Sequence, residues 1–206
     1  MMKKGLFITV EGTDGSGKTT QFRLIRDYIR EKGFDIVAVR DPGGTEIGEK
    51  IRGIILDPEN TEMERRTELL LYTASRAQLV AQLIRPALDE GKVVVCDRFV
   101  DSNVAYQGYG RGLSPEFIFE LNKAVTDSLC PDLTFFFDID PKIAITRLQN
   151  SADRLENESI DFHKRVYDGY CKIASDFPGR VKRIDCTRSI EEVFEDVKVY
   201  LDEIIG

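Results

Sequence analysis

The stretch Gly12-Thr13-Asp14-Gly15-Ser16-Gly17-Lys18-Thr19 decides the fold of this 206-residue chain. It matches the phosphate-binding pattern G-x-x-x-x-G-K-[ST] and lies between an apolar run at 6–10 and a helical pattern that begins at Lys18. Its glycines let successive backbone N–H groups converge on phosphate oxygens, and the start of the following helix adds positive potential. The stretch therefore predicts a phosphate-binding loop, with Lys18 on the β- and γ-phosphates and the Thr19 hydroxyl available to Mg²⁺.

Strand and helix patterns alternate along the rest of the chain. Apolar runs predict strands at 6–10, 35–39, 93–96, 134–137 and 181–184. Helical patterns lie between them, at 18–32, 46–55 and 64–89, then from Ser114, from Asp140 and from Ser189. This order predicts a single α/β domain over 1–206, with a five-stranded parallel sheet flanked by helices on both faces. Ligands of such a sheet bind at the carboxyl ends of its strands.

Composition excludes several classes of protein. With 29 Lys and Arg against 36 Asp and Glu, the net charge of −7 argues against a protein that coats nucleic acid. The apolar run at 6–10 is too short for a signal peptide or a membrane span. Four well-separated cysteines and one histidine disfavour a zinc site and indicate buried or half-buried free thiols. We therefore expect a cytoplasmic protein with no nucleic-acid or membrane partner.

Three classes of phosphate-loop protein compete: a GTPase switch, an ATP-driven motor and a small-molecule kinase. Asp41-Pro42-Gly43-Gly44 fits the D-x-x-G pattern of a switch. The guanine-reading N-K-x-D pattern is missing, however, because the only Asn-Lys pair continues as Ala124-Val125. A motor would carry further domains or a basic face. These observations favour a kinase and keep a nucleotide-dependent switch as the alternative.

A kinase for a phosphorylated acceptor needs a second site. Arg98 follows the third strand and offers positive charge for the acceptor phosphate. Asp97 before it suits the outer shell of a bound Mg²⁺, and Asp138 after the fourth strand is its rival. Tyr72 and Arg76 are four residues apart and share a helix face, where a ring and a guanidinium fork suit a flat base with carbonyl oxygens.

The polar segment at about 149–158 is a candidate lid that keeps water out. It carries Arg154, with Arg147 just before it, and such arginines can stabilise the charge of a transferring phosphoryl group. His163 lies among charged residues, so we expect it to be solvated and no general base to be present. A phosphate monoester needs no base, because its second pKa is about 6. The pattern thus favours a nucleoside monophosphate kinase.

These motifs together make the chain resemble the bacterial thymidylate kinases over essentially its whole length. The residues that carry the resemblance are the loop from Glu11 to Thr20, Arg40-Asp41-Pro42-Gly43-Gly44-Thr45, Tyr72 with Arg76, Asp97-Arg98-Phe99, Ser102-Asn103-Val104-Ala105-Tyr106-Gln107-Gly108, Pro131-Asp132-Leu133-Thr134 and Asp153-Arg154-Leu155-Glu156. The resemblance implies the transfer of the ATP γ-phosphoryl group to dTMP, giving dTDP and ADP for dTTP biosynthesis, with Mg²⁺. It also implies a homodimer that packs through helices including the long one.

The resemblance implies roles for individual residues as well. Catalytic roles fall to Lys18, Asp14, Arg98 and Arg154. Contacts to ATP fall to Gly12, Asp14, Gly15, Ser16, Gly17, Lys18, Thr19, Thr20, Arg147 and the backbone near Cys186. Contacts to dTMP fall to Asp14, Pro42, Tyr72, Arg76, Arg98, Ser102, Asn103, Tyr106 and Gln107. Tyr72 would stack on thymine, Arg76 would bind its carbonyl edge, and Tyr106 would wall the sugar pocket against a 2′-hydroxyl.

The chain departs from the family pattern at several positions. Asp41 stands where many bacterial members have Glu, Tyr72 where Phe is usual, and Phe99 where Tyr or His is common. The phosphate loop has no Arg, so the catalytic Arg should come from the lid, either Arg147 or Arg154. A kinase for another nucleoside monophosphate stays an alternative, because Tyr72 and Arg76 favour a pyrimidine without separating thymine from uracil.

Overall fold

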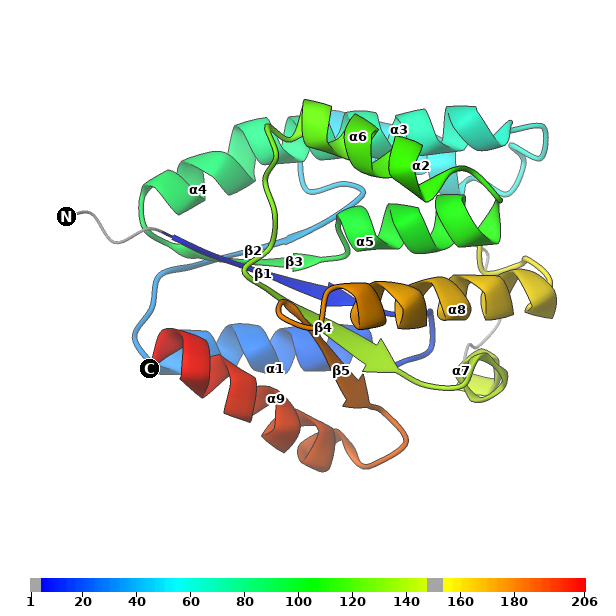
Figure 1. Ribbon diagram of the computed structural model, residues 1–206. Coiled ribbons are helices and arrows are strands. Elements are labelled where there is room, and N and C mark those ends of the chain that lie inside the picture. The colour runs from blue at the N-terminus through cyan, green and yellow to red at the C-terminus, as the bar shows by residue number, and fades with distance from the viewer. Residues whose placement is uncertain (1–4, 148–153) are drawn as a thin grey trace.

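A computed structural model describes residues 5–147 and 154–206, and its core is a parallel sheet of five strands (Figure 1). The strands are β1 (Leu6–Glu11), β2 (Ile36–Arg40), β3 (Val93–Asp97), β4 (Leu133–Asp138) and β5 (Val181–Asp185). They follow the order β2-β3-β1-β4-β5, and every neighbouring pair is parallel. Each lies within a residue or two of an apolar run in the sequence, so the predicted sheet is confirmed.

The register of the sheet brings two motifs to one edge. β1 lies in the centre, and its Val10 pairs with Asp97 of β3. The phosphate loop therefore leaves β1 beside the point where Asp97 and Arg98 leave β3. A crevice between such neighbouring strand ends is where open α/β sheets bind ligands.

Helices cover both faces of the sheet (Figure 1). One face carries α1 (Lys18–Glu31) and α9 (Ile190–Ile205). The other face carries α3 (Arg65–Leu79), η1 (Val80–Ile84), α4 (Arg85–Asp89), α5 (Val100–Asn103), η2 (Val104–Gly110) and α8 (Ile160–Asp176). The remaining helices are α2 (Glu46–Leu56), α6 (Pro115–Val125) and α7 (Pro141–Arg147). Because strand side chains alternate in direction, Ile8 packs toward α1 while Phe7 packs toward α4.

The long helix predicted at 64–89 is one continuous run that changes its hydrogen bonding. α3 passes into the π-helical turn η1, and α4 follows directly. Pro86 lies just beyond that turn, lacks an N–H group and would crowd the carbonyl four residues earlier in a regular α-helix. The wider turn at 80–84 accommodates that mismatch.

Two expectations for single residues were wrong. His163 is only 4% exposed, because α8 packs on η2 and the imidazole lies edge-on to Phe162. Cys130 is exposed, whereas Cys96 and Cys186 are buried, Cys171 is half-buried, and all four thiols are free. Within the described ranges, no helix is long and apolar enough to cross a membrane.

Candidate active site

The phosphate loop joins β1 to α1, and two of its glycines are required by close approaches. Gly12 has φ 142°, and a Cβ there would lie 2.6 Å from the carbonyl oxygen of Phe137. Gly15 has φ 80°, and a Cβ there would lie 2.2 Å from the carbonyl oxygen of Ala144. The loop can therefore pass under β4 and α7 only with glycine at both positions.

Lys18 points back across this loop. Its Nζ donates to the Thr13 carbonyl over 2.7 Å and lies 3.6 Å from Oδ1 of Asp14. Burial, together with the nearby Arg98, lowers the pKa of Lys18. Thr19 and Thr20, at the start of α1, are exposed, so their hydroxyls are accessible from the cleft.

Arg98 is the centre of the site. Its backbone has φ 68°, an unusual conformation for a non-glycine residue, and it directs the side chain across the strand ends. Nη2 donates to Oδ1 of Asp14 over 2.5 Å, and Nη1 donates to the Gly12 carbonyl over 3.0 Å. The guanidinium also packs against the ring of Tyr106, with 5.1 Å between its carbon and the ring centroid. It is thus fixed directly beside the phosphate loop.

Asp14 is ionised in this arrangement. Burial acts to raise its pKa, but Arg98 and Lys18 outweigh burial and hold the pKa below its ordinary value. The Tyr106 hydroxyl donates to Oδ2 of Asp14 over 3.0 Å, and burial raises the pKa of Tyr106 well above its usual range. Asp14 therefore links the phosphate loop to Arg98 and to the wall of the neighbouring cavity.

A buried carboxylate, Glu11, supports Arg98 from behind. It accepts hydrogen bonds from the Phe99 N–H over 2.7 Å, the Ser102 hydroxyl over 2.6 Å and the Tyr170 hydroxyl over 3.1 Å. Tyr170 and Ser102 in turn accept from Nη1 of Arg98. Burial, reinforced by Asp101, raises the pKa of Glu11 to about 7.

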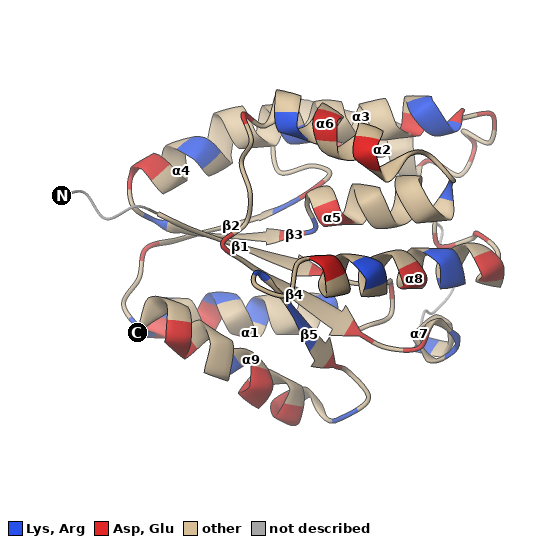
Figure 2. Cartoon of the chain, viewed as in Figure 1, with Lys and Arg blue, Asp and Glu red and all other residues tan. Residues whose placement is uncertain are grey.

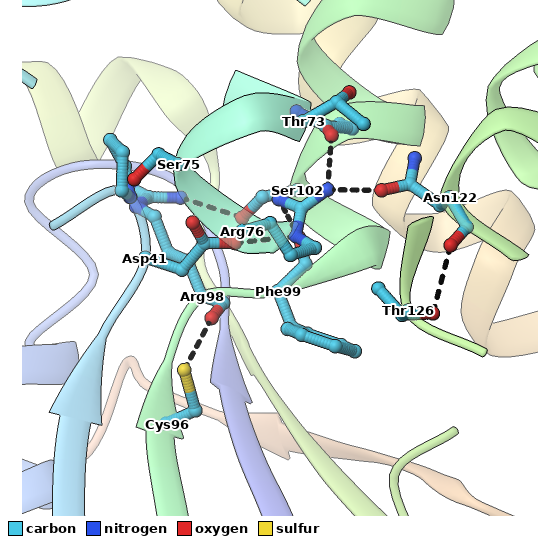
Figure 3. Close-up of polar contacts among 12 residues, drawn as sticks. Asp41, Thr73, Ser75, Arg76, Cys96, Arg98, Phe99, Ser102, Asn122 and Thr126 are labelled. Atoms are coloured by element: carbon cyan, nitrogen blue, oxygen red, sulfur yellow. Dashed lines mark hydrogen bonds and ion pairs between the residues drawn. The ribbon is translucent and has the colours of Figure 1, made fainter. Parts of the chain in front are cut away.

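Arg76 lies nearby in a fully buried position (Figure 3). Its Nε donates to Oδ2 of Asp41 over 2.5 Å, and Nη2 donates to the Phe99 carbonyl over 3.1 Å. Nη1 donates to Oδ1 of both Asn103 and Asn122. The peptide bond between Asp41 and Pro42 is cis. The Asp-Pro-Gly-Gly segment thus contributes a carboxylate that orients Arg76.

Two cavities meet at this point. One is lined by every residue predicted to bind dTMP, namely Asp14, Pro42, Tyr72, Arg76, Arg98, Ser102, Asn103, Tyr106 and Gln107. The other is a cleft of about 910 Å³ that runs along the phosphate loop from Asp14 to Thr20 and reaches Asp97, Arg147 and Cys186. Asp14 and Arg98 line both cavities. Gly12, the first residue of the loop, contacts the site through its carbonyl, which accepts from Arg98.

Comparison with known proteins identifies the family of this chain over nearly its full length. The family model described as thymidylate kinase matches residues 10–197. The chain belongs to the thymidylate kinase family. It is 47% identical over 208 residues to a thymidylate kinase of Geobacillus sp. (strain WCH70), covering 98% of this chain and 99% of that protein. A thymidylate kinase of Clostridium novyi (strain NT) is 45% identical, with 97% and 100% covered.

A solved structure agrees with these relatives. The crystal structure of thymidylate kinase from Ehrlichia chaffeensis superposes with a TM-score of 0.80 at 36% identity, covering 96% of this chain and 98% of that one. Membership of this family excludes the switch alternative. It also accounts for the missing N-K-x-D pattern.

Arg147 and Arg154, the two arginines predicted at the lid, lie in different places. Residues 149–153 of the predicted lid lie outside the described residues, so only 154–158 can be placed. Arg147 lines the cleft with the phosphate loop. Arg154 instead donates to Oε2 of Glu68 over 2.6 Å and to the Ile55 carbonyl over 3.0 Å.

Asp97 and Asp138, the two carboxylates predicted as alternatives beside Mg²⁺, lie in different places. Asp97 lines the cleft, and its buried Oδ1 has no hydrogen-bond partner within the described ranges. Asp138 pairs with Arg183 at the far side of β4. Of the two, Asp97 is therefore the one that lies with the phosphate loop in the cleft.

Several site residues of this family member carry no signal in the sequence. Tyr170 and Glu68 reach the site from α8 and α3 only through tertiary packing. Arg52 and Glu156 line both cavities, and Arg188 lines the cleft. Only Glu11 could have been suspected, because it is a carboxylate at the end of an otherwise apolar strand.

Proposed function

We propose that this chain transfers the γ-phosphoryl group of ATP to dTMP, giving ADP and dTDP for dTTP synthesis. The observation that supports it most is the pair of cavities joined at Asp14 and Arg98. A direct transfer needs the two reacting phosphates to meet in line, and this junction lies beside the phosphate loop. The acceptor phosphate would therefore bind at Arg98 while the γ-phosphate lies at Lys18.

ATP would occupy the cleft. The loop N–H groups and Lys18 would bind its phosphates, and Thr20 would bind the α-phosphate at the start of α1. Arg147 and Cys186 line the same cleft, and Arg147 and the backbone near Cys186 would border the adenine. Arg154 would contribute to phosphoryl transfer only if its guanidinium left Glu68.

The residues present fit a magnesium ion held mainly by ATP. Thr19 is exposed and lines the cleft, and Asp97 has a buried oxygen to which no residue of the described ranges donates. Within the described residues, no group of three or more His, Cys, Asp or Glu side chains could hold a metal alone. Mg²⁺ commonly takes one or two protein ligands and substrate phosphates, so this donor set is sufficient. When bound, Mg²⁺ neutralises charge on the β- and γ-phosphates.

dTMP would occupy the second cavity. The ring of Tyr72 would stack on thymine, and Arg76 would donate to a carbonyl of the base. Ser102, Asn103 and Gln107 would lie along the base and phosphate, while Pro42 packs against the acceptor. The hydroxyl of Tyr106 donates to Asp14. Its ring would wall the sugar pocket at the position where a 2′-hydroxyl would clash.

The proposed reaction needs no general base. A phosphate monoester has a second pKa of about 6, so at neutral pH dTMP is already an anionic nucleophile. Arg98, Lys18 and Asp14 would hold the reactants in line, and the two cations would stabilise charge that spreads over the transferring group. His163, the only histidine, lies in α8 against Phe162 and takes no part.

We also propose that the chain works as a homodimer in a reducing cytoplasm. Large apolar side chains are about half exposed on α2, α3 and α6, and α3 packs against both of the other two helices. They are Ile47 and Ile54 on α2, Leu70 on α3 and Phe117 on α6. Together these side chains would give a second copy of the chain an apolar surface to bind. The four free thiols fit a reducing compartment.

The charge pattern supports anionic substrates despite the acidic composition. Figure 2 shows Asp and Glu positions along α9, and along α8 where Lys and Arg positions alternate with them. Basic side chains that line the cavities include Lys18, Arg52, Arg76, Arg98 and Arg147. Local placement, rather than net charge, would attract two nucleotides.

A coupled assay of ADP release with dTMP, dUMP, dGMP and CMP tests the proposal. We expect the highest kcat/KM with dTMP. Higher kcat/KM with another monophosphate would support the alternative acceptor, and no stimulation by dTMP would refute the proposed function.

A further inference from the structure

A chain of hydrogen bonds runs along the acceptor cavity from Arg76 to Glu68. Nη1 of Arg76 donates to Oδ1 of Asn103, and Nδ2 of Asn103 donates over 2.8 Å to Oε1 of Gln107. Nε2 of Gln107 then donates over 2.8 Å to Oε1 of Glu68. The first three residues line the cavity, whereas Glu68 is fully buried in α3 behind them. The proposed reaction gives Glu68 no task.

The two ends of this chain determine how its two amides are oriented. A guanidinium can only donate hydrogen bonds, and an ionised carboxylate can only accept them. Asn103 must therefore turn its oxygen to Arg76, and Gln107 must turn its nitrogen to Glu68. If the amide of Gln107 were reversed, its oxygen would face a carboxylate oxygen and its nitrogen would face Nδ2 of Asn103.

Glu68 is itself held firmly in its ionised form. Arg111 donates from Nε to Oε1 over 3.2 Å and from Nη2 to Oε2 over 3.1 Å, while Arg154 donates to Oε2 over 2.6 Å. Burial acts to raise the pKa of Glu68, but hydrogen bonds from Arg111, Gln107 and Arg154 lower it below the ordinary value. Arg111 is fixed in turn by Glu158. At neutral pH the end of the chain is therefore a pure acceptor.

This orientation gives the cavity a defined pattern of donors and acceptors. Oε1 of Gln107 accepts from Nδ2 of Asn103, and Oδ1 of Asn103 accepts from Nη1 of Arg76, so the three residues follow one another along the cavity wall with their donors and acceptors in a fixed order. A base edge with a carbonyl next to a ring N–H, as in thymine and uracil, complements that pattern. Cytosine presents an amino group next to an unprotonated ring nitrogen, so it would place donor against donor and acceptor against acceptor.

We infer that Glu68 is a positioning residue for base selection: it fixes the amide of Gln107 so that the cavity accepts an imide-bearing pyrimidine and rejects cytosine. This inference rests on the proposed dTMP kinase function. Glu68 touches no substrate and acts only through Gln107. A site whose buried polar groups would be left unpaired by the wrong ligand discriminates strongly.

The test is the ratio of kcat/KM for dTMP to that for dCMP, measured for the full-length chain and for E68Q. The new amide can both donate and accept, so Gln107 would be free to take either orientation. We expect the ratio to fall at least about tenfold, through a higher KM for dTMP and a gain with dCMP. The KM for ATP should not change. In a Q107L background, adding E68Q should leave the ratio unaltered, because the two residues act as one unit.

Two matched variants separate this role from a structural one. R154Q removes a donor to Oε2 but keeps the carboxylate, so it should leave the ratio unchanged whatever it does to kcat. N103D removes the donor to Oε1 of Gln107 and tests the same constraint from the other end, including the case in which E68Q does not fold. An unchanged ratio in E68Q, or in N103D where E68Q is unfolded, overturns the inference. Absence of dTMP turnover in the unsubstituted chain refutes the proposed function instead.

Discussion

The phenol oxygen of Tyr170 lies 3.1 Å from Nη1 of Arg98, although 72 positions of the chain separate the two residues. The same oxygen lies 2.9 Å from the Ser102 hydroxyl and 3.1 Å from Oε2 of Glu11. Tyr170 thus connects α8 to the guanidinium that we assign to the acceptor phosphate. Because Tyr170 is 1% exposed, this contact is held by packing as well as by hydrogen bonding.

Replacing Tyr170 with Phe should impair acceptor binding alone. The ring and its packing remain, while the hydroxyl contacts to Arg98, Ser102 and Glu11 are lost. A lost hydrogen bond of about 1 kcal/mol corresponds to about a fivefold higher KM for dTMP. Steady-state kinetics with each substrate varied in turn would show this, with the KM for ATP unchanged.

Tyr167 offers a matched control on the same helix. Its hydroxyl accepts from Arg183 of β5 over 3.1 Å. Tyr167→Phe should therefore leave both KM values as they are. Equal effects of the two substitutions would show that α8 responds to any lost hydroxyl, which would contradict the role given to Tyr170.

Arg98→Ala should remove most of the acceptor binding. The loss of a buried, pre-oriented cation at the reacting phosphate should lower kcat/KM for dTMP about 10²–10³-fold. Arg98→Lys keeps the charge but loses the planar guanidinium fork. Its kcat/KM for dTMP should therefore lie between that of the unsubstituted chain and that of Arg98→Ala. The KM for ATP reports on the phosphate loop and should change little. An unchanged KM for dTMP in Arg98→Ala would contradict the assignment.

The sequence predicts the sheet and the phosphate loop well, because both are local patterns. Five apolar runs mark the strands, and the loop motif requires its particular neighbours on either side. In the acceptor cavity, Arg98, Tyr72 and Arg76 are predicted from their positions in the sequence, whereas the other residues are implied only by the resemblance. Tyr72 and Arg76 share a helix face, but nothing local indicates that Asn103 and Gln107 will meet Arg76.

The remaining features depend on contacts between distant segments. Tyr170 and Glu68 look like ordinary helix residues until α8 and α3 pack against η2. The same packing buries His163, whose charged neighbours wrongly suggested solvent. The π-helical turns at 80–84 and 104–110 likewise could not be predicted, because a repeat of 3.6 residues indicates only a regular α-helix.

Asp41→Ala should destabilise the fold. Asp41 and Arg76 form a pair in which both side chains are almost fully buried. Removing the carboxylate leaves an uncompensated buried guanidinium, which costs about 3 kcal/mol of the free energy of unfolding. Urea denaturation would measure the loss. The exposed pair of Asp27 with Arg26 is the control, and Asp27→Ala should leave the midpoint unchanged.

Leu70→Glu should separate the proposed homodimer. Leu70 is 54% exposed on α3, the helix that packs against both α2 and α6, and a charge there would have to be desolvated on association. Sedimentation equilibrium should show a dimer for the unsubstituted chain and a monomer for this variant. Val199, 58% exposed on α9 at the other face of the sheet, provides the control substitution Val199→Glu. A monomeric unsubstituted chain would refute the dimer.

Glu11 should give the fold a pH dependence that Glu11→Gln removes. Burial and Asp101 raise the pKa of this carboxyl from 4.5 to about 7 in the folded chain. The folded state therefore keeps a proton that the unfolded state releases, and its contribution to stability is complete below pH 4.5. That contribution is lost progressively as the pH rises from 4.5 to about 7.

Urea unfolding of the unsubstituted chain and of Glu11→Gln, at several pH values between 5 and 8, tests the direction of this pH dependence. The Gln amide mimics the protonated carboxyl, so the variant should gain stability relative to the unsubstituted chain as the pH rises, and the difference should level off above about 7. A difference that is constant with pH would show that Glu11 titrates alike in the folded and unfolded states. A difference of the opposite sign would mean that hydrogen bonds from Phe99, Ser102 and Tyr170 outweigh burial and hold the carboxylate ionised.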